Sequence, residues 1–221
     1  RIYEVFEGKN SKVLEANLRR LKGREQVKVI CMDLSSPFRS VVQRLFPRAK
    51  IVADRFHVIR LIIDTFHEFC KAVDPEIKWK RGITCALRTK GVNLRPAQRL
   101  LLEKEFSGHP AIQTAYDFKE ELCTLLSIKE RKRANCIPLL ERLKEMVWQM
   151  LHEAPEIFKK LGRTIRQWFE PIIRMWRFTK SNGITEGFHR KMKLIQRRAY
   201  GYRNFENYRL RVLIECGHVV I

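Results

Sequence analysis

The pattern of apolar and polar positions predicts two short strands near the start of the chain. Residues 27–32 form a β-branched apolar run that ends in Asp33, which predicts a central strand covered on both faces. Residues 49–53 form a second run, which ends in Asp54, and a helical pattern with Pro37 in its first turn lies between the two. Because the crossover of a β-α-β unit makes its strands parallel, we expect both acids at one edge of the sheet.

Each of these two aspartates has two interpretations. Ligands of open α/β sheets bind beyond the carboxyl ends of the strands, which makes Asp33 a candidate site residue. Asp33 also precedes the helix expected near Pro37, where an aspartate often caps the first turn. Asp54 likewise either caps the next helix, with His57 in its first turn, or contributes to a site. The residues alone leave both choices open.

The remaining pattern is mostly helical. Residues 2–7 alternate like an edge or hairpin strand, and Asn10 or Ser11 can cap a helix that reaches about Leu21. After Asp54 an apolar stripe at helical spacing continues to about Val73. No convincing strand follows until after Arg177. Prolines open or interrupt the helices expected in this block: Pro96, Pro110, Pro138 and Pro155.

The last segment predicts an amphipathic helix after a Ser-Asn-Gly turn. One face carries the packing stripe Phe188, Met192, Ile195 and Ala199. On the opposite face Glu186 heads a ladder of cations at the same spacing, namely Arg190, Lys193 and Arg197. An ordinary solvated face with a Glu186–Arg190 pair accounts for this spacing as well, and such a pair contributes only about 0.3–0.5 kcal/mol.

Charge narrows the choice of partner. The chain has 45 basic and 24 acidic side chains, a net charge of 45 − 24 = +21. Such an excess repels itself in a compact protein, so it favours a polyanionic partner. Nucleic acid is the first choice and an anionic membrane surface the second. We expect no membrane insertion, because no apolar run approaches the length of a span.

The six cysteines include no Cys-x-x-Cys pair and mostly have apolar neighbours. They indicate reduced core residues, with neither a disulfide framework nor a zinc finger. Two strand-end acids and a helix-borne glutamate in a basic protein instead suggest metal-dependent phosphoryl transfer. Carboxylates can hold two hard cations about 4 Å apart, and Mg²⁺ prefers such oxygen ligands.

Three motifs carry a resemblance to a known family. Lys50-Ile-Val-Ala-Asp-Arg-Phe-His57, Ser181-Asn-Gly-Ile-Thr-Glu-Gly187 and Arg197-Arg-Ala-Tyr-Gly-Tyr-Arg-Asn204 resemble the ISL3-type transposases of bacterial insertion sequences. The resemblance extends over essentially the whole chain. It implies an α/β, RNase H-like mixed sheet flanked by helices, with a large all-helical insertion before the last catalytic helix. The expected domains are residues 1–75 (core, first part), 76–178 (insertion) and 179–221 (core, catalytic helix).

The resemblance also implies roles for particular residues. Asp33 matches the second acid of the DDE triad and Glu186 the third, both as metal ligands, while Asp54 and His57 lie beside the site. The first acid is expected on a strand upstream of Arg1. His189 stands where the family pattern has asparagine, which puts the local geometry in doubt. DNA contacts are expected from the nearby cations: Arg190, Lys193, Arg197, Arg198 and Arg203.

The implied activity is strand cleavage at transposon ends and transfer into target DNA, with two Mg²⁺ or Mn²⁺ ions. A homo-oligomer on DNA, in a bacterial cytoplasm beside the nucleoid, is expected. Because the first acid is missing, we expect this truncated chain to be inactive. The alternative is a catalytically dead or domesticated remnant that binds DNA. An RNA-binding helical protein is a third interpretation, which no specific residue favours.

Overall fold

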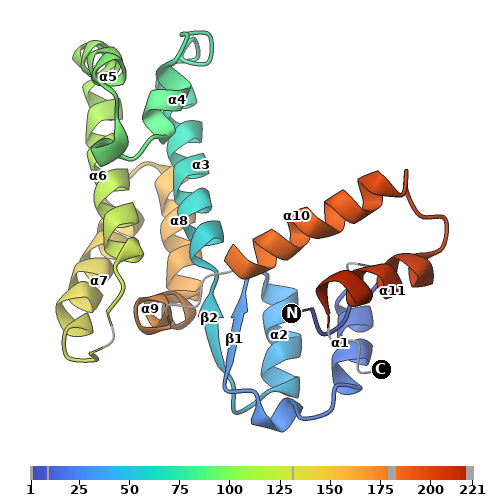
Figure 1. Cartoon of the computed structure of the whole chain (residues 1–221). Helices are drawn as coiled ribbons and strands as arrows, with labels where there is room; N and C mark the ends of the chain where they lie inside the picture. The colour runs from blue at the N-terminus through green and yellow to red at the C-terminus, as the bar shows by residue number, and fades with distance from the viewer. Residues whose placement is uncertain (1, 9, 131, 179–182, 218–221) are drawn as a thin grey trace. The chain divides into compact units, whose positions relative to one another are not determined.

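A computed structural model describes residues 2–8, 10–130, 132–178 and 183–217, without the side chains of 183–186. The chain forms two compact units. The first unit combines Arg1–Ile51 with Lys180–Ile221, and the helical unit is Val52–Thr179. The fold is mixed α/β, and helices dominate it (Figure 1). None of the described helices is both long and apolar enough to cross a bilayer.

The β-α-β pattern of the first unit is confirmed. Its elements are α1 (Ser11–Arg19), β1 (Val29–Met32), α2 (Ser36–Leu45) and β2 (Lys50–Ala53). Asn10 caps α1, because its side chain accepts a hydrogen bond from the N–H of Lys12 at 2.9 Å. Pro37 lies in the first turn of α2, where its missing N–H costs nothing. Local signals therefore determine where these helices begin.

The two strands form a parallel pair, but β1 is not the fully covered strand that we expected. Where β2 begins, the Lys50 N–H donates to the carbonyl of Lys28, the residue before β1, at 2.9 Å. The apolar cluster that covers the pair includes Val42 of α2 and Phe46, the residue that follows this helix. Val29 of β1 is nevertheless 37% exposed. The β-branched run predicted a strand correctly, but the other face lacks an apolar cover within the described residues.

The strand expected over residues 2–7 is wrong. Ile2 alone forms a β-bridge, to Gly217, and its N–H donates to the Cys216 carbonyl at 3.0 Å. Ile2 and Val5 pack instead against an apolar cluster around Val212. The alternation therefore reflects packing against helices, which needs apolar side chains at intervals but no ladder of backbone hydrogen bonds.

Two helices close the first unit, α10 (Gly183–Arg198) and α11 (Phe205–Cys216). Phe188, Met192 and Ile195 of α10 pack in the same cluster as Val212, which confirms most of the predicted stripe. Ala199 is exposed and does not belong to it. α10 ends at Arg198, so Ala199 lies just beyond the last residue of the helix.

The helical unit contains no strand in its described residues beyond the end of β2, as expected. Its helices are α3 (Arg55–Val73), α4 (Ile83–Arg88), α5 (Pro96–Gly108), α6 (Pro110–Ser127), α7 (Cys136–His152), α8 (Glu156–Gln167) and α9 (Phe169–Arg177). Trp168 and Trp176 are buried in its core. Trp79 and Trp148, by contrast, are exposed at 77% and 53%.

The RNase H-like fold and the three domain ranges remain predictions. The described sheet has two strands, and the boundary between the compact units falls inside β2. α3 belongs to the helical unit because it packs mainly against α6 and α8. Packing of this kind does not reveal which segments belong to an inserted domain.

Candidate catalytic site

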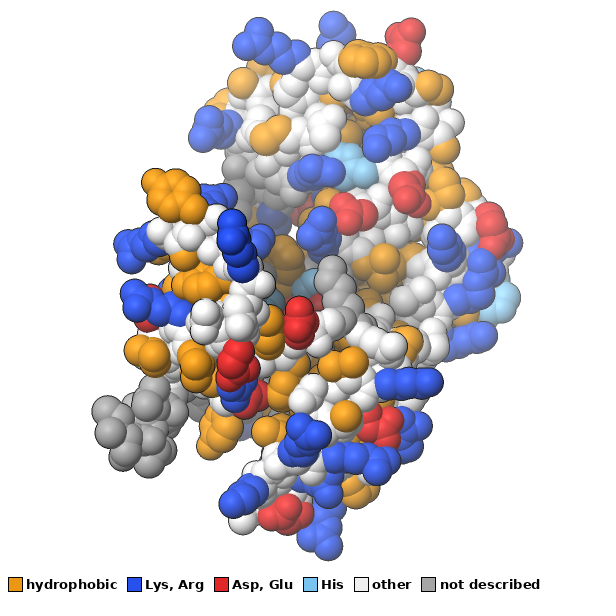
Figure 2. Space-filling model, turned by 90° about the vertical axis from the view of Figure 1, so that its right-hand side faces the viewer, with side chains coloured by type: hydrophobic (Ala, Val, Ile, Leu, Met, Phe, Trp, Pro, Cys, Tyr) orange, Lys and Arg blue, Asp and Glu red, His pale blue; other side chains and the backbone are white. Residues whose placement is uncertain are grey.

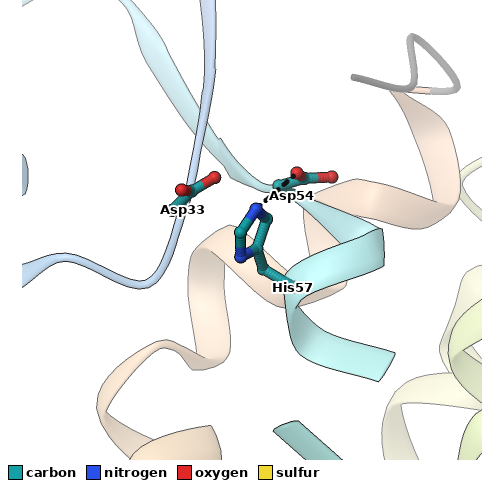
Figure 3. A group of neighbouring side chains, drawn as sticks. All are labelled: Asp33, Asp54 and His57. Atoms are coloured by element: carbon teal, nitrogen blue, oxygen red, sulfur yellow. Dashed lines mark ion pairs between the residues drawn. The ribbon is translucent and has the colours of Figure 1, made fainter. Parts of the chain in front are cut away.

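Asp54 begins α3 and is almost completely buried, with 3% of its side chain exposed. Its Oδ1 accepts a hydrogen bond from the N–H of Phe56 at 3.1 Å, so Asp54 is the N-cap of the helix. Its Oδ2 lies 3.6 Å from Nε2 of His57 (Figure 3). The two sequence interpretations of Asp54 therefore do not exclude one another, because each involves a different oxygen.

His57 lies in the first turn of α3 and is 41% exposed. The 3.6 Å separation from Asp54 is too long for a hydrogen bond but suits an ion pair when the imidazole is protonated. It is also close to the spacing of two neighbouring ligands of one divalent cation, which is roughly 3 Å for bonds of about 2.1 Å at right angles. The pair thus places one oxygen and one nitrogen donor side by side, and only the side chain that carries the nitrogen is exposed.

Arg55, between these residues, has a structural role that the motif did not reveal. Its Nη2 donates to the carbonyl of Met175 at 2.6 Å and to that of Ile128 at 3.2 Å. These carbonyls lie in α9 and just beyond the end of α6. Burial lowers the pKa of Arg55. Arg55 therefore anchors the start of α3 to two other helices and holds the turn that carries Asp54 and His57.

Asp33 directly follows β1 and is exposed. The alternative in which it caps the next helix is wrong, since the N-cap of α2 is Ser35. The backbone carbonyl of Asp33 accepts a short hydrogen bond from the N–H of Ser35 at 2.7 Å, which closes the turn between β1 and α2. Figure 3 draws its carboxylate on this turn. As expected, Asp33 and Asp54 each come directly after one of two hydrogen-bonded parallel strands.

Glu186 lies in the first turns of α10, but its side chain is outside the described residues, and so is any pairing with Arg190. The cations further along the helix are exposed: Arg190, Lys193, Arg197 and Arg198. Arg203, in the loop that follows, is exposed too. His189 is exposed on the same helix. On the face drawn in Figure 2, Lys and Arg side chains are scattered among apolar and uncharged ones and are more numerous than Asp and Glu.

Glu4, near the start of the first unit, is held by a cation. Arg209 of α11 binds it with two hydrogen bonds of 2.7 Å, from Nε to Oε1 and from Nη2 to Oε2. The hydrogen bonds from Arg209 lower the pKa of Glu4. This bidentate pair joins the two ends of the first unit. The carboxylate is therefore already occupied.

A second acidic group, in the helical unit, was not predicted. Asp74, Glu105 and His109 gather around Lys80, whose Nζ lies 2.7 Å from Asp74 Oδ2 and 2.8 Å from Glu105 Oε2. The hydrogen bond from Lys80 lowers the pKa of Asp74. The i, i+4 spacing of Glu105 and His109 was the only signal in the sequence. Because an ammonium group already fills the centre, this group is an ion-pair network and not a second metal site.

Acids at the ends of parallel strands are suited to bind divalent metal ions, and exposed basic side chains attract nucleic-acid phosphates. The family comparison agrees. A family model described as a transposase, of the ISL3 type of DDE enzymes, matches residues 1–212. The chain therefore belongs to this transposase family.

Two curated relatives are similar to the chain. The transposase for insertion sequence element IS1001 of Bordetella parapertussis is 22% identical over 202 residues, 85% of this chain and 47% of that protein. A protein of Lactococcus lactis subsp. lactis named ATP-dependent protease is 26% identical over 121 residues, 55% of this chain and 36% of that protein. The chain thus spans less than half the length of either relative. No solved structure matches.

Proposed function

We propose that this chain forms part of the catalytic region of an insertion-sequence transposase, which cleaves DNA at the transposon ends and joins it to a target. The observation that carries the proposal is the pair of parallel strands that end in Asp33 and Asp54, in a chain of the transposase family. Strand ends of this kind are where open α/β sheets bind ligands. The activity is thus proposed for the whole protein that contains these 221 residues.

The donor atoms fit a hard divalent cation. Asp33 presents an exposed carboxylate, and Asp54 and His57 add an oxygen and a nitrogen 3.6 Å apart. In the proposal Asp33 and Glu186 hold Mg²⁺ or Mn²⁺, while Asp54 and His57 position the neighbouring groups. The bound cations would supply Lewis acidity at the phosphate and the attacking oxygen. The cap of Asp54 and the hydrogen bonds of Arg55 hold the start of α3, which carries His57.

The cations of α10 hold the DNA in this proposal. Within the described residues, no carboxylate lies within ion-pair reach of Lys193, Arg197, Arg198 or Arg203. Such side chains attract phosphates irrespective of base sequence. They follow Glu186 along one helix, so a strand bound along α10 passes the proposed metal ligand. A homo-oligomer on paired DNA ends remains an expectation.

The test uses the natural protein that contains this chain, with DNA that carries its own transposon end. We expect cleavage that depends on Mg²⁺ or Mn²⁺, and we expect Asp33→Asn and Glu186→Gln each to abolish it without loss of DNA binding. Asp64→Asn is the matched control, because Asp64 is an exposed acid farther along α3, paired with Arg60 at 3.5 Å. Full cleavage by either of the first two variants would contradict the assignment.

A second candidate function is DNA binding without cleavage. His189 favours it, since this residue departs from the asparagine of the family pattern three residues after Glu186. Under this alternative the same protein binds end DNA but leaves it intact at every metal concentration. His189→Asn then separates the two functions. Cleavage by the variant but not by the wild type would identify His189 as the defect. Equal cleavage by both proteins would show that histidine is accepted there and would refute this alternative.

A further inference from the structure

The loop between α10 and α11 contains an unusual backbone position. Tyr200 has φ = +52°, and among the described residues it is the only one other than glycine with a positive φ. Gly201 follows with φ = +100°. The Tyr200 N–H donates to the Arg197 carbonyl at 3.1 Å, and the Gly201 N–H to the Gln196 carbonyl at 3.0 Å. The turn therefore ends α10 with two successive residues in the left-handed region, where only glycine is unstrained.

The side chain of Tyr200 gains nothing from the fold of this protein. Its relative exposure is 101%, so the ring is fully open to solvent and packs against none of the described residues. Tyr202, two residues later, behaves in the ordinary way: its ring packs at 5.3 Å from that of Tyr208, beside the apolar cluster of the first unit. Glycine or asparagine at position 200 would adopt the same backbone at lower cost. Neither burial nor backbone preference accounts for a tyrosine here.

The surroundings of Tyr200 are strongly cationic. Arg197 and Arg198 precede it, Arg203 follows it, and all three are exposed. Proteins that bind unpaired nucleic acid commonly combine cations, which hold the phosphates, with exposed aromatic rings, on which bases stack. A base inside an intact duplex already stacks on its neighbours, so such a ring needs an unpaired or displaced base.

We propose that Tyr200 is a base-stacking residue, whose ring receives an unpaired or displaced base of the DNA held by the cations of α10. The inference rests on the proposed function, because it requires that this face binds DNA. It adds that the face distinguishes DNA with an accessible base from fully paired DNA. The strained turn holds the ring away from the protein, and thus free to stack.

The test measures the affinity of the 221-residue chain for two fluorescent DNAs: a duplex with a short unpaired extension, and the same duplex fully paired. Tyr200→Gly should weaken binding to the extended duplex about tenfold, equivalent to about 1.4 kcal/mol, and leave the paired duplex within about twofold. Tyr200→Phe keeps the ring and should bind like the wild type. Because glycine relieves the backbone, Tyr200→Gly should be at least as resistant to urea as the wild type, which separates lost binding from lost folding.

The matched control is Tyr3→Gly, since Tyr3 is an exposed tyrosine (89%) outside this turn, and it should bind both DNAs normally. The double variant Lys193→Ala/Arg197→Ala tests the DNA face itself. If Tyr200→Gly binds both DNAs normally while this double variant binds both more weakly, the stacking proposal is overturned and the proposed DNA face stands. If Tyr200→Phe loses as much as Tyr200→Gly, the hydroxyl and not the ring makes the contact, which overturns stacking as well. If the wild type binds neither DNA, both proposals fail.

Discussion

The two compact units differ in how they use their side chains. The helical unit buries a broad apolar core, including Trp168 and Trp176, and it even buries the charged Lys119. The first unit has two small apolar clusters, one around Val42 and one around Val212. Yet the first unit carries Asp33 and the exposed basic side chains of α10, including Lys193, Arg197 and Arg198. The helical unit is thus built around a large buried core, whereas the first unit exposes the groups to which the proposed function assigns metal and DNA.

The largest expected effect is on the core of the helical unit. Trp176 is 1% exposed, and its Nε1 donates to the Leu125 carbonyl at 2.9 Å. Trp176→Ala should lower the free energy of unfolding by about 3–5 kcal/mol, because it leaves a cavity in a close-packed core. Urea titration measures this. Trp79→Ala, at a tryptophan that is 77% exposed, should change it by no more than about 0.5 kcal/mol; equal effects would break the comparison.

The second effect depends on pH. Burial, followed by the charge of Arg88, lowers the pKa of His67 to about 4, and Arg88 Nε donates to His67 Nε2 at 3.2 Å. Between this pKa and the ordinary 6.5 the unfolded chain binds the proton that the folded chain rejects, so stability falls as the pH decreases. The loss through that window is on the order of 3 kcal/mol. Urea titrations at several pH values measure this loss of unfolding free energy. In His67→Gln the free energy of unfolding should depend less on pH; an equal dependence in variant and wild type would show that His67 is not the cause.

The third effect concerns DNA. Replacing Lys193, Arg197 and Arg198 together by alanine should weaken DNA binding about a hundredfold at moderate salt, about 2.7 kcal/mol, and reduce the salt slope by about 2.7. Exposed cations of α8 are the charge-matched control: Lys160, Arg163 and Arg166. Fluorescence anisotropy at several salt concentrations measures the DNA affinity of both variants. A larger loss in the α10 variant would show that these cations contact DNA, rather than act only through the net charge. Equal losses in both variants would mean that the helical unit binds DNA as strongly.

The smallest effect tests the cap of α3. Asp54→Ala should cost about 1 kcal/mol of stability, since the N–H of Phe56 loses its acceptor, whereas Asn can cap the helix as well as Asp. Asp54→Asn should therefore fold normally. A loss of metal affinity in this variant would then show that the carboxylate of Asp54 contributes to metal binding, independently of its role as a cap. Calorimetric titration with Mn²⁺ measures that affinity. Normal metal binding by both variants would restrict Asp54 to its role as a cap.

Much of the local structure could be predicted because its causes lie within a few residues. Asn10 and Pro37 mark the starts of α1 and α2, and Pro96 and Pro110 the starts of α5 and α6. The failures have the opposite character. Residues 2–7 have the alternation of a strand, but Ile2 meets Gly217 from the far end of the chain, a partner that no local pattern identifies.

The sequence by itself determined the helices, the paired strands with their terminal acids, the basic charge and the family. Only the tertiary structure decided how individual polar groups are used. It placed Arg55 on two distant carbonyls, buried Lys119 against the carbonyl of Leu87 at 3.0 Å, and left Tyr200 exposed while Tyr202 packs. The physical reason is that periodicity and capping act over one or two turns. The partner of a long polar side chain comes from whichever element packs against it.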